Sequence, residues 1–301
     1  MNKSRRNFLK TSAFMGASIA GVASTKPVKG APKNILSDDR MGVLVDTTVC
    51  IGCRKCEWAC KSAHDMPTDP IEKYDDRSVF DKRRRPDAHA LTVVNEFENQ
   101  NGKFPIDVKV QCMHCDHPAC LSACIVGAFS KEENGAVLWN GDKCIGCRYC
   151  MVACPFQIPA FEFDKAWSPD IKKCDFCFDR TKKGMLPACV EICPMEVLTY
   201  GKRSELIRAA KEKIRLYPER YVDHILGEHE VGGTSWMYLS SKDFAQLDFP
   251  KLGKNAAPGV TEAIQHGIFA YFIPPIAIYA LLGGVMWLNK NRKHEEHGGD
   301  E

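Results

Sequence analysis

Residues 144–155 read Cys-Ile-Gly-Cys-Arg-Tyr-Cys-Met-Val-Ala-Cys-Pro. The four cysteines of this stretch are separated by two, two and three residues, and a proline follows the last of them. This spacing is typical of loops that bind a cubane [4Fe-4S] cluster, because three closely spaced thiolates can reach three iron atoms of one cube. The three-residue step is expected to begin a helix that carries the last sulfur away. The fourth thiolate of the cluster must then come from another part of the chain.

The whole sequence contains sixteen cysteines, which fall into four motifs of four with none left over. Since one cubane takes four thiolates, the predicted cofactors are four [4Fe-4S] clusters. In chain order the motifs are Cys50, Cys53, Cys56 and Cys60; Cys112, Cys115, Cys120 and Cys124; Cys144, Cys147, Cys150 and Cys154; and Cys174, Cys177, Cys189 and Cys193.

Two other readings of the cysteines compete with this one. An even number of cysteines in an exported chain can form a disulfide framework. Such frameworks rarely place three cysteines within seven residues, as the first and third motifs do. Structural zinc sites use separated C-x2-C pairs, and the fourth motif alone would suit one. Beside the other three, it is better interpreted as a stretched cluster motif.

The motifs repeat within the chain. Residues 50–54 and 144–148 both read Cys-Ile-Gly-Cys-Arg, and residues 118–120 and 187–189 both read Pro-Ala-Cys. The glycines of the first pair lie in tight loops where a positive φ is expected. Duplication of a two-motif ancestor explains the repeats. We therefore predict an α+β fold of two pseudo-repeated, bacterial-ferredoxin-like double-cluster modules with β-hairpin insertions, plus one C-terminal transmembrane helix.

Local patterns predict a few elements around the motifs. Residues 91–98 and 104–110 are expected to form one hairpin, and residues 128–129 and 136–139 a second hairpin across Asn134-Gly135. Ser204 is the expected N-cap of a helix that ends near Leu216. Residues 202–265 are accordingly interpreted as that helix followed by a linker tail.

The two ends of the chain suggest an export signal and a membrane anchor. Residues 4–10 read Ser-Arg-Arg-Asn-Phe-Leu-Lys, which predicts a twin-arginine signal within residues 1–31. Residues 267–288 carry no charge and are long enough to cross a bilayer, so residues 266–289 are the predicted anchor and residues 290–301 a polar cytoplasmic tail. The cluster domain would then lie on the periplasmic side of a bacterial inner membrane. The alternatives are a random basic N-terminus and a buried core helix.

The remaining features are less specific. The formal net charge of +3 gives no reason to expect nucleic acid. The basic residues 82–85 would usually form a solvated loop, or would contact a partner or anionic lipid. His114 and His117 lie inside the second motif and are interpreted as neighbours rather than ligands, because four cysteines are already available there. Cations beside the cysteines are expected to favour reduced clusters: Arg54, Lys55, Arg148, Lys172 and Lys173.

With these residues in view, the chain resembles the four-cluster ferredoxin-type electron-transfer subunits of membrane-bound respiratory complexes. The resemblance is carried by residues 111–115 (Gln-Cys-Met-His-Cys), 147–156 (Cys-Arg-Tyr-Cys-Met-Val-Ala-Cys-Pro-Phe) and 173–177 (Lys-Cys-Asp-Phe-Cys), and it covers residues 42–201. The chain is most similar to the subunit that serves a membrane-bound nickel-iron hydrogenase. The sequence carries no catalytic motif, so a non-catalytic subunit of an oxidoreductase complex is expected.

The resemblance implies partners and ligand sets. The partners would be a periplasmic catalytic subunit, nickel-iron hydrogenase-like, and an integral membrane subunit that is quinone-reactive or a cytochrome b. The beta subunit of a formate dehydrogenase or molybdopterin reductase, or a structural metal-binding scaffold, are the alternatives. The four implied sets are Cys50, Cys53, Cys56 and Cys193 (first set); Cys60, Cys174, Cys177 and Cys189 (second set); Cys112, Cys115, Cys120 and Cys154 (third set); and Cys124, Cys144, Cys147 and Cys150 (fourth set).

Overall fold

The structure, a computed structural model, describes residues 40–99, 104–258 and 278–288. The predicted twin-arginine segment and most of the predicted anchor lie outside these residues. Residues 278–288 are helical. Within the described ranges, none of the helices combines the length and apolar character that crossing a bilayer requires.

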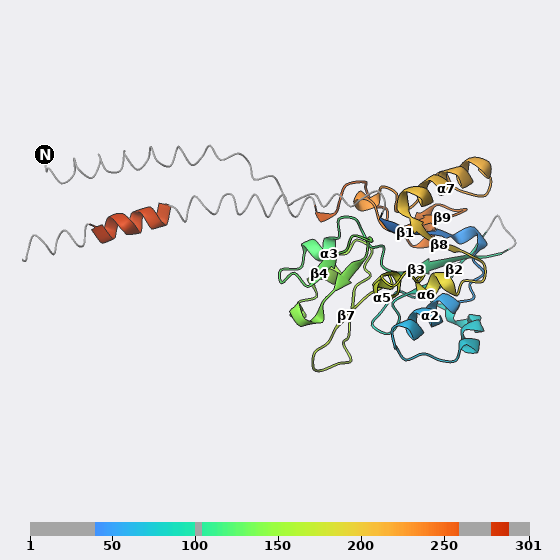
Figure 1. Cartoon of the computed structure of the whole chain (residues 1–301), viewed down its shortest axis with the longest axis horizontal. Helices are drawn as coiled ribbons and strands as arrows, with labels where there is room; N and C mark the ends of the chain where they lie inside the picture. The colour runs from blue at the N-terminus through green and yellow to red at the C-terminus, as the bar shows by residue number, and fades with distance from the viewer. Residues whose placement is uncertain (1–39, 100–103, 259–277, 289–301) are drawn as a thin grey trace, which may run out of the picture. The chain divides into compact units, whose positions relative to one another are not determined.

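Between α7 (Arg203–Leu216) and the hairpin of β2 (Val93–Phe97) and β3 (Ile106–Val110) lies a three-stranded sheet (Figure 1). Its middle strand, β1 (Met41–Asp46), pairs antiparallel with β8 (Leu198–Lys202) and parallel with β9 (Trp236–Leu239). Because successive side chains of a strand point to opposite faces, the buried residues of β1 and β9 divide between two cores. Val43, Val45, Trp236 and Tyr238 join the main core, which also contains cysteines.

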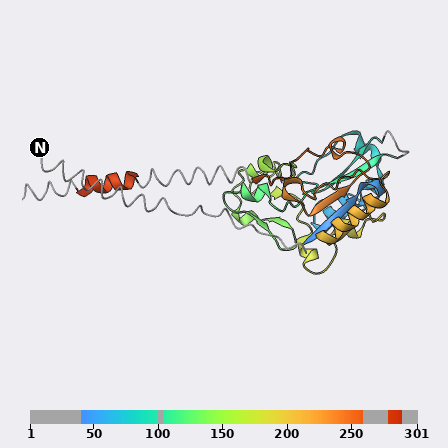
Figure 2. The ribbon, with the colours of Figure 1, turned by 90° about the horizontal axis from the view of Figure 1, so that it is seen from above.

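The other face of the sheet is covered by α7 (Arg203–Leu216), which lies along β1 and β8 (Figure 2). Leu206 and Ala210 of this helix pack against Leu44, Met237 and Leu239 of the sheet. The helix begins one residue before the predicted N-cap Ser204, and Lys202 holds the N-cap position without a side-chain hydrogen bond. The buried Arg203 donates hydrogen bonds to three carbonyl oxygens, of Gly227, Glu228 and Thr234, so tertiary contacts hold the first residue of the helix in place.

The prediction of a linker tail is wrong for the described residues 219–258. Strand β9 lies in this stretch, and its four side chains are at most 1 % exposed. A strand buried on both faces reads as a short continuous apolar run, without the alternation that marks a half-buried strand. The four residues of β9 therefore gave no strand signal, although they complete the three-stranded sheet.

Both predicted hairpins are confirmed. Strand β2 (Val93–Phe97) pairs antiparallel with β3 (Ile106–Val110), and β4 (Phe129–Lys131) pairs antiparallel with β5 (Val137–Trp139). A third, very short pair joins β6 (Ala160–Phe161) and β7 (Ile171–Lys172), which the sequence did not predict. The 3-10 helices are η1 (Thr47–Val49), η2 (Ile71–Asp75), η3 (Arg77–Asp81), η4 (Gly141–Lys143), η5 (Glu230–Gly232) and η6 (Phe244–Leu247).

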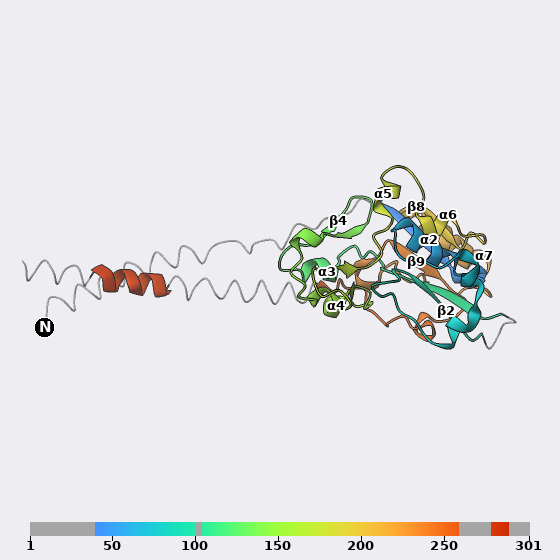
Figure 3. The same ribbon diagram turned by 90° about the horizontal axis from the view of Figure 1, so that it is seen from below.

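Short helices follow the cysteine loops and pair across the sequence. Helix α2 (Lys55–Ala63) of the first motif packs against α6 (Ala188–Glu191) of the fourth, and α3 (Ala119–Ser122) of the second packs against α4 (Tyr149–Ala153) of the third (Figure 3). Helix α5 (Phe178–Thr181) lies between the cysteine pairs of the fourth motif. The two modules are thus nested, because the outer motifs pack together and the inner motifs pack together.

The basic run at residues 82–85 is not a plain solvated loop. Arg84 donates two hydrogen bonds to Glu57 of α2, Arg83 lies over the ring of Phe97, and Arg85 donates to the carbonyl oxygen of Phe156. Lys82, Arg83 and Arg85 are exposed, and of these Lys82 alone makes no such contact among the residues that the structure describes. Arg84 also donates to the carbonyl oxygen of Val94 in β2, so it ties α2 and the β2–β3 hairpin together, which the charge pattern alone did not indicate.

Candidate metal centres

The cysteine loops have the backbone conformation that their repeat predicted. Gly52 has φ +65° and Gly146 has φ +68°, and the arginines that follow two residues later, Arg54 and Arg148, also have positive φ. In the third motif this geometry lets the backbone N–H of Gly146 donate to Sγ of Cys144 at 3.4 Å. Backbone N–H groups that point at sulfur favour the thiolate, which is the form that binds metal.

The first set of cysteines comes together at one end of the main core. Cys50, Cys53, Cys56 and Cys193 line a single small apolar cavity, although Cys193 belongs to the fourth motif. Burial, followed by the charges of Asp107, Cys193 and Cys53, raises the pKa of the Cys50 thiol to about 12. Four thiols in such surroundings would not ionise together unless a cation compensated their charge.

The second set is the most deeply placed. All four of its cysteines are buried, namely Cys60, Cys174, Cys177 and Cys189. Burial, and next the charge of Cys189, raises the pKa of Cys177 to about 12. Cys60 is an electrostatic neighbour of both Cys174 and Cys189, so the last cysteine of the first motif joins three from the fourth.

The third and fourth sets are built in the same crossed manner. Burial, with the charges of Cys112 and Cys154 among the further causes, raises the pKa of Cys120 to about 12. Burial, followed by the charges of Cys144, Cys147 and Cys124, raises the pKa of Cys150 to about 11. In each set, three cysteines of one motif meet the last cysteine of another, and all sixteen are free thiols.

The four sets also act on one another electrostatically in a fixed order. Cys56 of the first set is a neighbour of Cys189 of the second, and Cys174 of the second is a neighbour of Cys112 of the third. Cys120 of the third set is in turn a neighbour of Cys150 of the fourth. A chemical donor set of four clustered thiols, repeated four times in a row, fits [4Fe-4S] clusters, whose irons take Cys thiolates.

Comparison with known proteins agrees with this chemistry. Two family models described as 4Fe-4S dicluster domains match residues 49–128 and 106–203. The Hydrogenase-2 operon protein HybA of Escherichia coli O157:H7 is 32 % identical over an alignment 329 positions long, which covers 99 % of this chain and 98 % of that protein. The chain belongs to the family of HybA-like iron–sulfur electron-transfer subunits. This family membership supports the double-cluster modules of the predicted fold, and both hydrogenase-type and formate-dehydrogenase-type relatives are present.

Two further relatives are similar to this HybA-like subunit. A protein of Nitratidesulfovibrio vulgaris is 48 % identical over 260 residues, covering 85 % of this chain and 70 % of that protein. The nitrate-inducible formate dehydrogenase iron-sulfur subunit of Escherichia coli is 34 % identical over 201 residues, covering 65 % of this chain and 66 % of that protein.

The two histidines of the second motif have different surroundings in this HybA-like subunit. His117 is exposed, whereas His114 is fully buried against Phe176, with ring centroids 5.0 Å apart. Nδ1 of His114 accepts a hydrogen bond of 2.8 Å from the backbone N–H of Val137. Burial lowers the pKa of His114, so the ring is neutral and serves to fix the loop beside β5.

His64 is a residue that the sequence reasoning did not single out. Its Nε2 lies 2.9 Å from Oδ1 of Asp175, and its Nδ1 lies 2.7 Å from the carbonyl oxygen of Cys60. These contacts link α2 of the first motif to the loop of the fourth motif. They hold together the two segments that supply the second set.

The predicted cations beside cysteines mostly face other groups. Arg54 donates to the carbonyl oxygen of Asp76, Arg148 lies over the rings of Phe161 and Phe163, and Lys172 pairs with Asp170. Lys55 makes no ion pair among the residues that the structure describes. Lys173 is buried and donates to the carbonyl oxygens of Cys174 and Val137.

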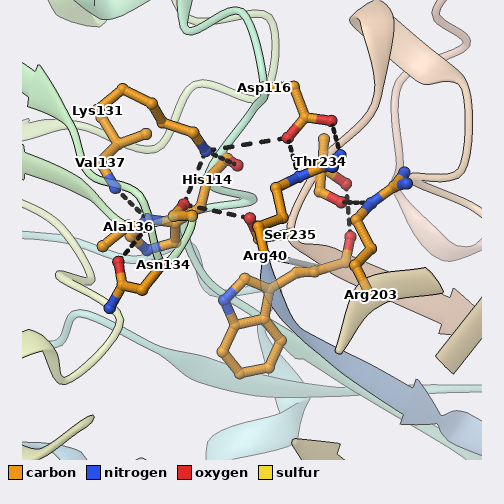
Figure 4. Close-up of polar contacts among 12 residues, drawn as sticks. Arg40, His114, Asp116, Lys131, Asn134, Ala136, Val137, Arg203, Thr234 and Ser235 are labelled. Atoms are coloured by element: carbon orange, nitrogen blue, oxygen red, sulfur yellow. Dashed lines mark hydrogen bonds and ion pairs between the residues drawn. The ribbon is translucent and has the colours of Figure 1, made fainter. Parts of the chain in front are cut away.

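Two other lysines with buried side chains, Lys109 and Lys131, lie near cysteines that are not their neighbours in the sequence. Nζ of Lys131 donates to the carbonyl oxygens of His114 and Gly135 and lies 3.9 Å from Asp116, which Arg40 also contacts (Figure 4). This network fixes the second motif against the chain around Ser235, whose backbone N–H donates to the carbonyl oxygen of His114. No spacing rule would have indicated either lysine, because both reach the thiols only through the β-hairpins.

Proposed function

We propose that this chain relays electrons through four [4Fe-4S] clusters between a periplasmic, hydrogenase-like catalytic subunit and a membrane subunit that is quinone-reactive or a cytochrome b. When bound, each cluster can take up and release an electron. The residues that would hold them are the four sets of cysteines. The single observation that carries the proposal is the order of these sets, in which each set adjoins the next.

The exposure of the sets supports a relay with two ends. The second set in the middle of the row is buried, whereas Cys147 of the fourth set is exposed and Cys53 of the first is half-buried. Apolar side chains stand exposed around the fourth set, namely Ile145, Tyr149 and Val152. A protein partner would cover such residues, so the fourth set is the proposed docking end for one of the two partners.

The proposed location rests on the ends of the sequence. The twin-arginine pattern in residues 4–10 would export the chain after its clusters were inserted in the reducing cytoplasm. The uncharged residues 267–288, followed by Lys290, Arg292 and Lys293, would anchor it with the C-terminus in the cytoplasm. Under this proposal the cluster domain of residues 42–201 lies in the periplasm, and the polar tail of residues 290–301 lies in the cytoplasm.

The experiment is a redox titration, followed by EPR, of the complex purified anaerobically with its native partners. The proposal expects reducible cubane signals and loss of quinone-linked turnover in an assembled Cys147→Ser complex. If the Cys147→Ser complex assembles and keeps full turnover, the cysteines serve a structural scaffold and the relay is refuted.

A second candidate is the same relay in a formate dehydrogenase complex. The formate dehydrogenase iron-sulfur subunit that matches this chain favours it, although the match covers less of both proteins than the match to HybA does. The subunit that co-purifies decides between them. A nickel-iron large subunit supports the hydrogenase proposal, and a molybdopterin protein supports the formate dehydrogenase or reductase alternative.

A further inference from the structure

Lys109 is the most deeply buried cation beside the cysteine sets. It lies on β3 and is only 3 % exposed. Its Nζ donates a hydrogen bond of 2.9 Å to Oε1 of Gln111 and lies 4.5 Å from the ring centroid of Trp236. Both of these partners are neutral, and no carboxylate pairs with Lys109 among the residues that the structure describes.

The charges that face Lys109 are those of cysteines from two different sets. Its electrostatic neighbours are Cys189 and Cys174 of the second set and Cys56 of the first set, followed by Tyr238. Lys109 also lines the small cavity that Cys50, Cys53, Cys56 and Cys193 line, so its side chain reaches the first set directly. An ammonium group at this place would lie against the negative charge of the cluster that the first set would hold.

A buried charge without a partner is strongly unfavourable, so a buried lysine needs negative charge nearby. A cubane held by four thiolates is negative, and reduction adds one more negative charge. A fixed cation at short range in a poorly screened interior stabilises the more negative, reduced state. Lys131 differs because Asp116 already lies 3.9 Å from its Nζ.

We propose that Lys109 is a shared tuning residue, whose positive charge raises the reduction potentials of the clusters held by the first and second sets together. The inference rests on the proposed cluster relay and goes beyond it. Because one charge acts on two adjacent centres, it shifts both potentials in the same direction. The difference between the two potentials, which drives the electron from one centre to the other, is then changed much less than either potential.

The test is a redox titration, followed by EPR, of the complex that carries Lys109→Met, which keeps most of the length of the side chain and removes its charge. Signals are assigned to sets with one Cys→Ser variant in each set. The expected result is a roughly tenfold or larger change in the reduction equilibrium of the first-set and second-set clusters toward the oxidised form. For a one-electron couple this is about 59 mV.

Two controls separate charge from packing. Tyr238→Phe removes the hydroxyl that donates to the carbonyl oxygen of Lys109 and accepts from Gln111, but leaves every charge in place. Tyr238→Phe should change the reduction equilibrium of the two clusters by less than about threefold. Lys109→Arg keeps the charge and should stay close to the unmodified protein; if Lys109→Met loses iron, the comparison is made between Lys109→Gln and Lys109→Arg.

The inference would be overturned if a variant without the Lys109 charge held its full iron content and kept unchanged reduction potentials. It would also be overturned if the reduction potentials of all four clusters shifted equally. Either result would leave the relay itself intact. If the unmodified complex showed no reducible cubanes at all, the proposed function would fail first. The two failures are thus distinguishable in one experiment.

Discussion

Two glycines in equivalent loops show how single residues shape the metal centres. Gly52 and Gly146 both have positive φ, so alanine at either position costs about 1–2 kcal/mol in backbone strain. A Cβ on Gly52 would lie 2.4 Å from Oδ1 of the buried Asp107, whereas a Cβ on Gly146 would lie 3.6 Å from Phe161, an ordinary contact. The loops are related in sequence, but only one is closed by a neighbouring side chain.

We therefore expect Gly52→Ala to destabilise the protein more than Gly146→Ala, by roughly a further 1 kcal/mol because Asp107 must move within a packed core. Melting midpoints of the two variants, purified anaerobically with equal iron content, measure the difference. Equal melting midpoints would show that Asp107 gives way without cost.

Asp46 provides a test of pH dependence away from the cysteines. Its carboxylate accepts hydrogen bonds from Thr48, Lys213 and Tyr221, and the side chain is buried. Burial would raise its pKa, but these hydrogen bonds lower it below the ordinary value. A carboxyl group with a lowered folded-state pKa contributes stability above its unfolded pKa, near 3.9, and loses it as the pH falls through the folded value.

Asp46→Asn should accordingly destabilise the protein at pH 7 by about 1–3 kcal/mol. The difference in stability between the unmodified protein and Asp46→Asn should become smaller below about pH 4. Thermal unfolding of both proteins in parallel from pH 7 to pH 3 measures it, and cluster loss in acid affects both alike. A gap that stays constant over this range would show that the Asp46 charge is unimportant.

At the scale of elements, one ion pair joins a cluster helix to a hairpin. Glu57 of α2 accepts from Arg84 at 2.6 and 3.0 Å and from the backbone N–H of Val94 in β2 at 2.6 Å. Its side chain is 4 % exposed, and that of Arg84 is 24 % exposed. Helix α2 carries Cys56 and Cys60, so this contact fixes two ligands of different sets relative to β3 and Lys109.

Arg84→Ala should cost about 2–3 kcal/mol, less than the roughly 3–5 kcal/mol for breaking a buried pair, because Arg54 still lies 3.7 Å from the buried Glu57. Lys82→Ala is the matched control from the same basic run, and its cost should stay below about 0.5 kcal/mol because Lys82 is exposed. Melting midpoints again measure both. Similar losses for the two variants would mean that the basic run acts only through its total charge.

The elements also show which parts of the fold the sequence could predict. The hairpin around Asn134-Gly135 was predictable because its turn residues and flanking strands act locally. Strand β9 was not, because a strand buried on both faces has no alternation and its partner β1 lies almost two hundred residues earlier. The start of α7 was also missed, since buried contacts of Arg203, and no side-chain cap, mark it.

At the scale of the whole molecule, each motif gives its last cysteine to a set that another motif mainly supplies. Spacing alone predicted all sixteen thiols and the loop glycines, because those are local requirements of a cubane. Spacing could not say which motif supplies the fourth thiol of each set, and here the resemblance to a family supplied the expectation. Lys109 remained hidden because it reaches the thiols through the β2–β3 hairpin, and folding rather than sequence distance brings them together.

This exchange of the last cysteine between motifs predicts which cysteine variants alter the same EPR signal. Cys50→Ser and Cys193→Ser should remove or alter the same EPR signal, because both side chains line one cavity. Cys189→Ser is the control: it lies in the same motif as Cys193 but belongs to the second set, so it should alter a different signal. EPR spectra of the three reduced variants decide the matter, and a common signal for Cys189 and Cys193 would contradict the crossed sets.

The account depends most directly on what the sixteen thiols hold. Iron and acid-labile sulfide should be assayed on the complex purified without oxygen, with zinc measured on the same sample. We expect close to sixteen iron and sixteen sulfide atoms per chain, because four cubanes each contain four of both. Iron and sulfide far below those amounts, or zinc in their place, would contradict the relay.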